Sequence, residues 1–475
     1  MRVVASLALV SLVLAGAGAA STRQEAARGG DWTRFGYDAA RSGSGPRTTG
    51  ITAANVGMLM RQRISLDGTV DSSPIYLRGA RIGGRPHDAF FVTTSYGKTL
   101  AIDADSGRVL WRYTPKGYGS WAGSSQITQS TPVADPTRRS VYAVSPDGRI
   151  HKLAVANGHE AAGWPVAITR DPEHEKIAPA LNYSRGLVLA ATGGYIGDAP
   201  PYQGHVVAIE GRSGRIVSVW NSLCSDRGGL IAPSSCPESG SAIWARSGVV
   251  VDPVTHDLLV ATGDGRFDGG RYWGDSVLML APRGGRLLQN WTPRNQEELE
   301  TGDVDLGSTA PALVGSRLAV QSGKDGKLRL LDLRRLNGSG GSGPTTGGEL
   351  QTVGIPEGLF SAPAVWRSGG RTWVFVSGSG STQAFEVSER RLHAAWKTTS
   401  GGTSPVVAGG LLYVYDAGVG GLAVLRPTTG ALVARLPAGT GHWNSPIVTD
   451  GRVALPEGDA NEHSVRGVLD IYRLP

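Results

Sequence analysis

Residues 89–111 read AFFVTTSYGKTLAIDADSGRVLW. The first six residues are mostly apolar or β-branched, as in a half-buried strand, and Gly97 interrupts them. A second strand is expected over 99–103, and Asp105-Ser106-Gly107 has the composition of a tight turn. Val109-Leu110-Trp111 then begins a further strand. This stretch predicts short strands joined by turns that contain glycine.

A short motif recurs ahead of similar stretches: a small residue, then Pro, then an apolar residue. One of its eight copies has Gly in place of Pro. The copies begin at Ser73, Thr131, Ala178, Ser247, Ala310, Ala362, Ser404 and Ser445. Four short strands per unit of roughly 40–70 residues are typical of a propeller blade, and Pro is tolerated where a first strand begins. The sequence therefore predicts an all-β fold, an eight-bladed β-propeller of four-stranded antiparallel blades, with segment 31–43 as a candidate for the closing strand.

The composition agrees with such a fold. Gly (69) and Pro (27) make up about a fifth of the 475 residues, and Gly follows no three-residue period, which excludes collagen. A hydrophobic content of 40%, with 12 Trp and 13 Tyr, argues against a disordered chain. The 47 Lys and Arg against 40 Asp and Glu are scattered rather than clustered, so we expect no nucleic-acid partner.

The N-terminus has the pattern of an export signal. Arg2 precedes an apolar run from Val3 to Leu14, and small residues follow it. The run is shorter than the roughly 20 residues of a membrane span, and no Cys for lipid attachment follows it. We expect a signal peptide over 1–19, a flexible segment over 20–30 and a single propeller over 31–475. The predicted mature protein is a secreted or periplasmic monomer without a membrane span.

The two cysteines lie in a loop rich in Ser, Gly and Pro. Cys224 and Cys236 are 12 positions apart, because 236 − 224 = 12. In an oxidising compartment, such a pair is more typical of a disulfide than of a metal site. We therefore predict a disulfide that stiffens this loop.

Residues 101–111 resemble the tryptophan-docking repeat of the pyrroloquinoline quinone (PQQ)-like, quinoprotein alcohol dehydrogenase-like β-propellers. In that family, the Trp of the repeat packs between neighbouring blades. The segment Asp31-Trp32-Thr33-Arg34-Phe35-Gly36-Tyr37-Asp38 also resembles the start of these domains. The resemblance covers essentially all of the predicted mature chain.

Two further segments resemble the quinone site of the dehydrogenases in that family: 240–265, and 291–326 with its Gly302-Asp303-Val304-Asp305. The resemblance implies that Trp244 is the floor on which PQQ stacks and that Lys324 contacts the quinone carbonyls. It also implies that Asp264 binds calcium and that Asp303 is the catalytic base. An aromatic platform and oxygen ligands suit a planar quinone and a hard cation.

The chain also departs from that pattern. The vicinal Cys pair of the alcohol-oxidising members is absent, and no C-x-x-C-H heme motif occurs. Residues 192–198 have Tyr or Ile near the position of the expected calcium-binding Glu, and Asp264 stands where the family has Asn.

Each site residue also has a structural interpretation. Trp244 is more typical of a blade-packing residue than of a quinone floor, and Asp303 and Asp305 are suited to turn hydrogen bonds. Gly323-Lys324-Asp325-Gly326 has the composition of a hairpin turn. Asp264 with Asp268 and Asp275 is a second acidic set that suits calcium, or one that is simply solvated.

Two hypotheses of function follow. In the first, the propeller is an exported binding or assembly module with a degenerate quinone site, which takes a protein or small-molecule ligand at its funnel and no cofactor. The family's barrel-assembly lipoprotein is a relative of this kind. In the alternative, the protein is a PQQ- and calcium-dependent dehydrogenase that oxidises an alcohol, polyol or sugar. If the alternative holds, Trp244, Asp264, Asp303 and Lys324 should converge at one end of the central channel.

Overall fold

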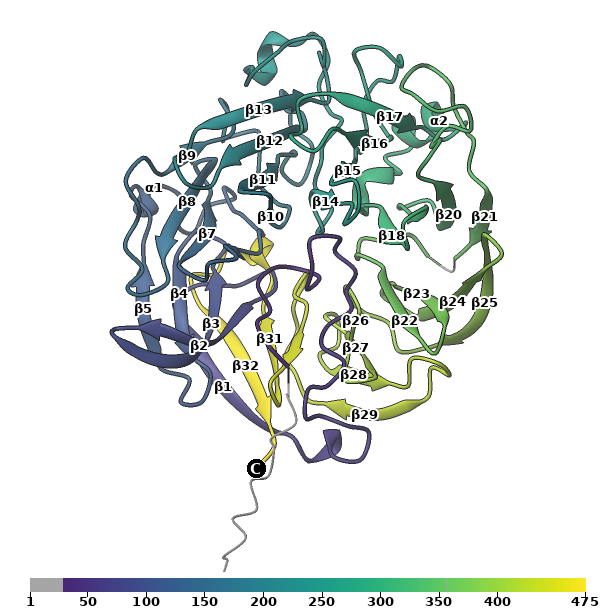
Figure 1. The fold of residues 1–475 in the computed structure, drawn as a ribbon. Helices are drawn as coiled ribbons and strands as arrows, with labels where there is room; N and C mark the ends of the chain where they lie inside the picture. Colours follow the sequence, from purple (N-terminus) through teal and green to yellow (C-terminus); the bar gives the residue numbers. More distant parts are fainter. Residues whose placement is uncertain (1–28, 356) are drawn as a thin grey trace, which may run out of the picture.

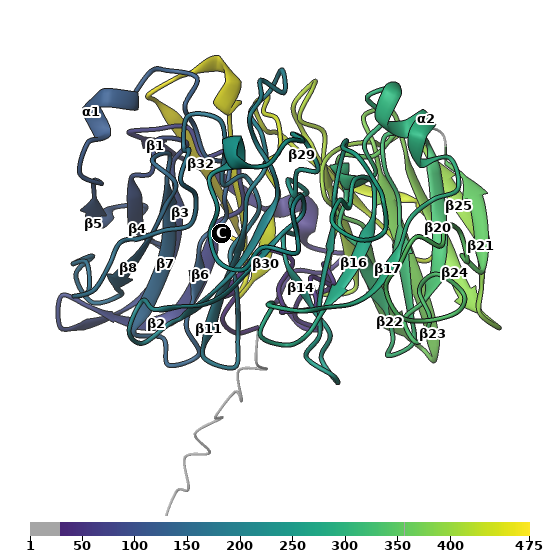
Figure 2. The same cartoon turned by 90° about the horizontal axis from the view of Figure 1, so that it is seen from above.

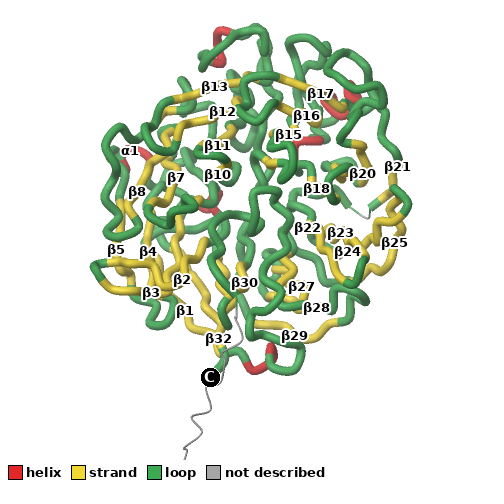
Figure 3. Tube along the Cα trace, viewed as in Figure 1, coloured by secondary structure: helices red, strands yellow, loops and turns green. Residues whose placement is uncertain are grey.

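The computed structural model describes residues 29–355 and 357–475, so the predicted signal peptide lies outside the described residues. Eight four-stranded antiparallel sheets are arranged as a ring around a central axis (Figure 1). This confirms the predicted eight-bladed, all-β propeller. Strands and loops make up almost all of the chain (Figure 3). No helix among the described residues is long and apolar enough to cross a membrane.

Blades are numbered here by the order of their first strands. The first four comprise β2 (Ile75–Ile82), β3 (Arg85–Thr93), β4 (Thr99–Asp103) and β5 (Val109–Tyr113); β6 (Val133–Ala134), β7 (Ser140–Ser145), β8 (Arg149–Ala154) and β9 (Val166–Ala167); β10 (Asn182–Ser184), β11 (Leu187–Ala191), β12 (His205–Glu210) and β13 (Ile216–Asn221); β14 (Val250–Val251), β15 (Leu258–Ala261), β16 (Val277–Leu280) and β17 (Leu287–Trp291).

The other four comprise β18 (Ala312–Val314), β19 (Leu318–Gln321), β20 (Lys327–Asp332) and β21 (Gln351–Gly354); β22 (Ala364–Ser368), β23 (Arg371–Ser377), β24 (Thr382–Ser388) and β25 (Arg391–Thr398); β26 (Val406–Ala408), β27 (Leu411–Tyr415), β28 (Leu422–Leu425) and β29 (Leu432–Leu436); β30 (Ile447–Thr449), β31 (Arg452–Glu457), β32 (Gly467–Arg473) and β1 (Met60–Leu66). Each copy of the Pro motif stands at or just before the first strand of a blade.

The helical segments of the described residues are short turns. They are α1 (Tyr118–Trp121), α2 (Gln296–Thr301), η1 (Val56–Met58), η2 (Pro233–Ser235), η3 (Leu306–Ser308) and η4 (Ala460–Glu462). Seen from the side, α1 and α2 lie at the same face of the disc (Figure 2).

Docked tryptophans join the first blade to the second and the sixth blade to the seventh. The indole of Trp111 on β5 donates a hydrogen bond of 2.8 Å to the carbonyl of Val155 in the next blade. A Cβ on Gly158 would stand 2.6 Å from that indole, so only glycine leaves room for the ring. Trp396 docks in the same way on Gly430 of the next blade. The apolar core is accordingly divided into clusters, several of which lie between adjacent sheets.

The strand that closes the ring is not the predicted one. β1 pairs with β32, in register from Met60 opposite Arg473 to Leu66 opposite Gly467. The segment expected to close the ring, 31–43, contains left-handed residues such as Tyr37 and Arg41, which prevent an extended strand.

Segment 31–43 instead fills the channel and bonds to the first strands of several blades. Backbone hydrogen bonds join Trp32 to Tyr76 of β2, Ser42 to Val365 of β22 and Gly43 to Val407 of β26. Figure 1 shows this purple segment crossing the middle of the ring.

The buried side chain of Arg41 pins the same segment to the third blade. It donates hydrogen bonds to the carbonyls of Ala180 and Leu181. This end of the channel is therefore blocked by the protein's own backbone.

Four charged side chains secure the closing strand. Arg61 of β1 lies 2.5 Å from a carboxylate oxygen of Glu457 and 2.6 Å from one of Asp470, and Arg63 lies 2.6 Å from the second oxygen of Glu457. Burial and the neighbouring Glu457 raise the pKa of Asp470 to about 7. Asp470 therefore takes up a proton on folding at intermediate pH, and its cost to stability grows as the pH rises toward 7.

We predict that Arg61→Met destabilises the protein by about 3 kcal/mol, because it leaves two buried carboxylates with one arginine. The loss should be larger at about pH 8 than at about pH 5, where Asp470 can remain protonated. Chemical unfolding at the two pH values measures this difference. Arg371→Met, which breaks an exposed pair with Glu386, is the control and should cost about 0.5 kcal/mol or less. Equal losses at both pH values would contradict this account of the closure.

Candidate functional site

A cavity of about 370 Å³ lies on the propeller axis. Its lining residues come from the connections that precede the first strands of several blades, and from the loops β11–β12, β19–β20 and β31–β32. Connections from so many blades meet only at the axis, so the cavity lies at one end of the channel. The channel-filling segment 31–43 closes the other end.

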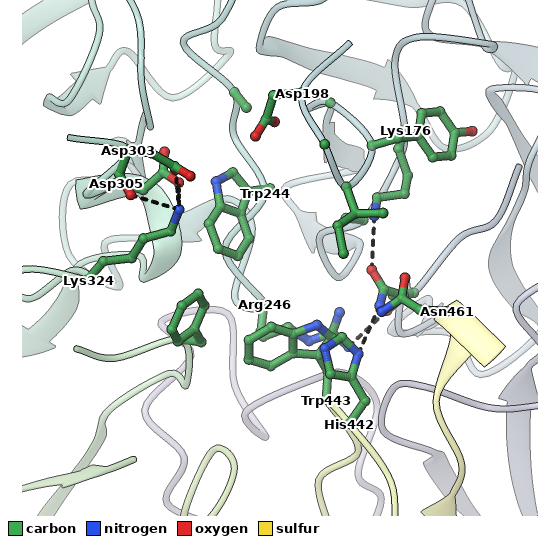
Figure 4. A pocket seen from close by; sticks show the side chains of 18 residues that line it. Lys176, Asp198, Trp244, Arg246, Asp303, Asp305, Lys324, His442, Trp443 and Asn461 are labelled. Atoms are coloured by element: carbon green, nitrogen blue, oxygen red, sulfur yellow. Dashed lines mark hydrogen bonds and ion pairs between the residues drawn. The ribbon is translucent and has the colours of Figure 1, made fainter. Parts of the chain in front are cut away.

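One wall of the cavity carries an acidic group around a lysine (Figure 4). The ammonium of Lys324 lies 2.5 Å from a carboxylate oxygen of Asp303 and 2.7 Å from one of Asp305. The other oxygen of Asp305 accepts a 2.8 Å hydrogen bond from the amide of Asp264. One carboxylate oxygen from each of these three aspartates lies within 4.8 Å of the others. We call Asp264, Asp303 and Asp305 the acidic group.

The structure thus brings together Trp244, Asp264, Asp303 and Lys324, which the sequence had singled out. Asp305 was expected to serve a turn, yet its side chain is buried at the centre of the acidic group, whereas Asp303 is exposed. The sequence signal for Asp305 was its position two residues after Asp303.

Burial and the closeness of the carboxyl groups disfavour the ionised forms of Asp264 and of the neighbouring Asp275. Burial, together with Asp305 and Asp275, holds the pKa of Asp264 well above its usual range. Burial and Asp305 likewise raise the pKa of Asp275 to about 8. One oxygen of Asp264 and one of Asp275 are buried without a hydrogen-bond partner. Such a set of oxygens is suited to a hard cation.

A further carboxylate faces the same wall from the loop after β11. The resemblance expected a Glu near Tyr195 or Ile196, but Tyr195 donates a hydrogen bond to the carbonyl of Pro172 and Ile196 is exposed to solvent. Asp198 lines the cavity instead. Burial and the charge of Asp305 raise its pKa. Sequence reasoning missed Asp198 because it lies beyond the aligned position, in the same turn.

Aromatic side chains form another part of the lining. Trp244 lies in the cavity wall, and its ring centroid is 6.1 Å from that of Phe360, which lies 5.5 Å from that of Trp443. The clusters between blades do not include Trp244. Figure 4 shows its indole between the acidic group and Lys176. Trp244 is therefore available to a ligand that stacks.

The predicted disulfide between Cys224 and Cys236 is present, with a Cα–Cα distance of 6.1 Å. Its loop packs against the segment that leads to Asp275: Leu223 bridges Tyr272, and the indole of Trp273 donates a 2.9 Å hydrogen bond to Ser225. The disulfide loop thus supports one side of the acidic wall. A disulfide also indicates an oxidising, non-cytoplasmic compartment.

Comparisons with known proteins agree with the fold. The family model PQQ_2, described as outer membrane protein assembly factor BamB, matches residues 48–233. The quinohemoprotein alcohol dehydrogenase ADH IIB of Pseudomonas putida is 25% identical over 367 residues, which are 69% of this chain and 49% of that protein. The chain thus spans about half the length of this curated relative.

Two solved structures are similar in fold. The quinohemoprotein alcohol dehydrogenase ADHIIG of Pseudomonas putida HK5 has a TM-score of 0.71 at 15% identity, with 94% of this chain and 80% of that chain covered. BamB of Moraxella catarrhalis has a TM-score of 0.53 at 16% identity, with 87% and 97% covered.

Eight docked blades around an axial cavity define the chain as a closed β-propeller with a pocket at one end of its channel. Its repeats and these matches support a relationship to the PQQ-like, quinoprotein alcohol dehydrogenase-like β-propeller family.

We predict that Asp275→Asn removes a pH-dependent loss of stability. An unfolded Asp has a pKa near 3.8 and folded Asp275 one of about 8, so the native state holds an extra proton between these values. Wild-type stability therefore falls with rising pH by up to about 1.4 kcal/mol per pH unit from this residue alone. Asn keeps an oxygen to accept the hydrogen bond from the amide of Leu306. Chemical unfolding across this pH range should show a shallower fall for Asp275→Asn, and no change for the exposed Asp226→Asn.

Proposed function

We propose that the protein is a PQQ- and calcium-dependent dehydrogenase that oxidises an alcohol, polyol or sugar outside the cytoplasm. The observation that carries this proposal is the convergence of Trp244, the acidic group and Lys324 on one axial cavity. A scaffold alone gives no physical reason to bury carboxylates beside one another at the end of a channel. The similarity to quinohemoprotein alcohol dehydrogenases supports the same class of chemistry.

The residues present fit both groups. Asp264 and Asp305 would hold calcium, because their oxygens converge and one oxygen of Asp264 lacks a partner. Asp198 would supply a further carboxylate, in place of the Glu that the sequence lacks. Trp244 would hold the quinone by stacking, and Lys324 would hold its carbonyl edge by hydrogen bonds.

When bound, the quinone supplies an acceptor for the hydride that leaves the substrate carbon. Asp303 would take the proton of the substrate hydroxyl, because it is the most accessible carboxylate of the acidic group. Lys324 holds Asp303 in position through an ion pair of 2.5 Å. Because no heme-attachment motif occurs in the sequence, the electrons would pass to an external acceptor.

Reconstitution tests the proposal against the binding-module hypothesis, which the match to the BamB family model supports. Purified protein would be incubated with PQQ and calcium, then examined for quinone absorbance that co-elutes with the protein and for dye reduction with a panel of alcohols and sugars. Turnover supports the dehydrogenase. The absence of both binding and turnover would leave the binding module as the better hypothesis.

We predict that Asp303→Asn lowers kcat by about 10²- to 10⁴-fold while quinone binding is retained, because the variant loses the proton acceptor and keeps the aromatic platform. Glu297→Gln, an exposed change on the nearby helix α2, is the matched control. Steady-state dye reduction and the absorbance of bound quinone separate the two effects. Wild-type turnover in Asp303→Asn would exclude Asp303 as the base.

We also predict that calcium stabilises the wild-type protein. At about a hundred times its Kd, calcium should add about 2.7 kcal/mol and raise the Tm. Asp305→Asn should abolish most of this gain, because it removes the central carboxylate of the acidic group. Thermal unfolding with and without calcium measures the effect, with Glu297→Gln again as control. A gain that survives in Asp305→Asn would place calcium elsewhere.

A further inference from the structure

The face of the disc opposite the cavity is strongly basic. The hairpins that join the first strand of a blade to the second, and the third to the fourth, end on this face, because the other connections lead to the cavity side. Figure 2 shows α1 and α2 at the cavity side and the β22–β23 hairpin at the opposite side. We call the side on which these hairpins end the hairpin face. Each of the first six blades exposes at least two arginines there.

Acidic side chains do not balance these arginines at the surface. Three exposed doublets lie in the hairpins: Arg138-Arg139, Arg334-Arg335 and Arg390-Arg391. Among the acidic residues of the described hairpins, only Asp105 and Glu389 are exposed, and Asp105 is paired with Arg452 at 2.5 Å. The arginines are scattered along the sequence, and the fold gathers them on one face.

Many of these arginines have no acidic partner. Arg138, Arg371 and Arg390 do form ion pairs, with Asp31, Glu386 and Asp332. Within the part of the chain that the structure describes, no ion pair is formed by four other exposed residues of the hairpin face: Arg139, Arg317, Arg334 and Arg391. An unpaired guanidinium keeps its charge and its five N–H donors for a ligand.

A hollow of about 450 Å³ lies on the hairpin face between the sixth and seventh blades. Arg367 and Arg371 line it from the β22–β23 hairpin, Gly410 from the β26–β27 hairpin, and Arg47 from the segment that follows the channel filling. The indole of Trp366 is part of the same lining. Arginine binds phosphate through paired hydrogen bonds, and tryptophan is common at the level of lipid headgroups. The hollow therefore suits a phospholipid headgroup.

Exposed apolar side chains lie on the same face. Val254, in the β14–β15 hairpin, is 67% exposed, and Leu432, the first residue of β29, is 55% exposed. Met60 is also exposed, where β1 begins opposite the end of β32. Apolar side chains beside basic ones suit the boundary between the headgroups and the acyl chains of a bilayer. A nucleic-acid backbone offers no such apolar layer.

We propose that the hairpin face docks the protein on a lipid bilayer that contains anionic phospholipids. The arginines extend over six neighbouring blades, so a flat anionic surface engages many of them at once, whereas a linear polyanion crosses only some blades. In this orientation the axial cavity faces the solution. The docking needs neither quinone nor turnover, so it goes beyond the proposed function.

Co-sedimentation of the purified protein with lipid vesicles tests the docking. Vesicles of phosphatidylcholine with about 30% phosphatidylglycerol are compared with vesicles of phosphatidylcholine alone. We expect binding to the anionic vesicles at about 0.1 M salt and a loss of affinity of about tenfold or more at about 0.5 M, because salt screens exposed charges. This comparison uses only the wild-type protein.

A quadruple variant tests which face binds. Four unpaired arginines of the hairpin face are changed together: Arg139→Gln, Arg317→Gln, Arg334→Gln and Arg391→Gln. The affinity for anionic vesicles should fall about tenfold or more, because each basic residue near the surface contributes to binding. The matched control removes the same number of charges from exposed residues on the cavity side: Lys116→Gln, Arg170→Gln, Arg294→Gln and Arg466→Gln. Its affinity should stay within about twofold of the wild type, because these side chains face away from the bilayer.

Three results would overturn the proposal: equal binding to both kinds of vesicle, binding that salt does not weaken, or equal losses in the two quadruple variants. Release of the protein from the vesicles by a DNA duplex of about 20 base pairs, at an equal concentration of phosphate, would also overturn it and point to a nucleic acid instead.

Discussion

The structure depends on the way each blade docks against the next. At two of the junctions, a large indole on the outer strand of one blade lies against a glycine turn of its neighbour: Trp111 on Gly158 and Trp396 on Gly430. The indole buries apolar area and donates one hydrogen bond across the junction. Apolar packing and a directional hydrogen bond therefore both hold the two blades together. The closing junction uses a variation: Gly107 leaves room for Ile64 of β1, the strand that completes the last blade. A ring closed in this way brings connections from many blades to one axis.

Because these connections meet at the axis, they form the cavity and bring charged side chains close together, which lowers the stability of the fold. The acidic group and the cationic side chains of Lys176 and Arg246 come from axial connections and loops, which no single blade could bring together. Buried like charges and unpaired cations lower the stability of a fold unless a ligand compensates them. The eight-bladed ring, the channel-filling segment and the disulfide loop supply the rigidity that holds these groups in place.

Much of the fold was predictable because its signals are local. The Pro motif begins each blade, and turn glycines such as Gly107 separate short apolar strands. The closing strand was mispredicted, because pairing between residues 60–66 and the chain's far end is a long-range choice that local patterns do not encode. In the site, Trp244, Asp303 and Lys324 follow one another along the chain in the order expected from the resemblance to the dehydrogenases. Asp198 carried none, because what brings it into the cavity is the path of a loop.

The sequence alone determined the number of blades and the disulfide pairing, because repeats and spacings are properties of the chain. It also supplied the candidate residues Trp244, Asp264, Asp303 and Lys324, through the resemblance of their segments to the dehydrogenases. Only the tertiary structure decided which of their neighbours share the cavity. Lys176 precedes the third blade and Arg246 the fourth, and no pattern in the chain relates them to the acidic group. They face a common space because the closed ring turns its connections toward the axis. Burial there disfavours the charged forms of both side chains.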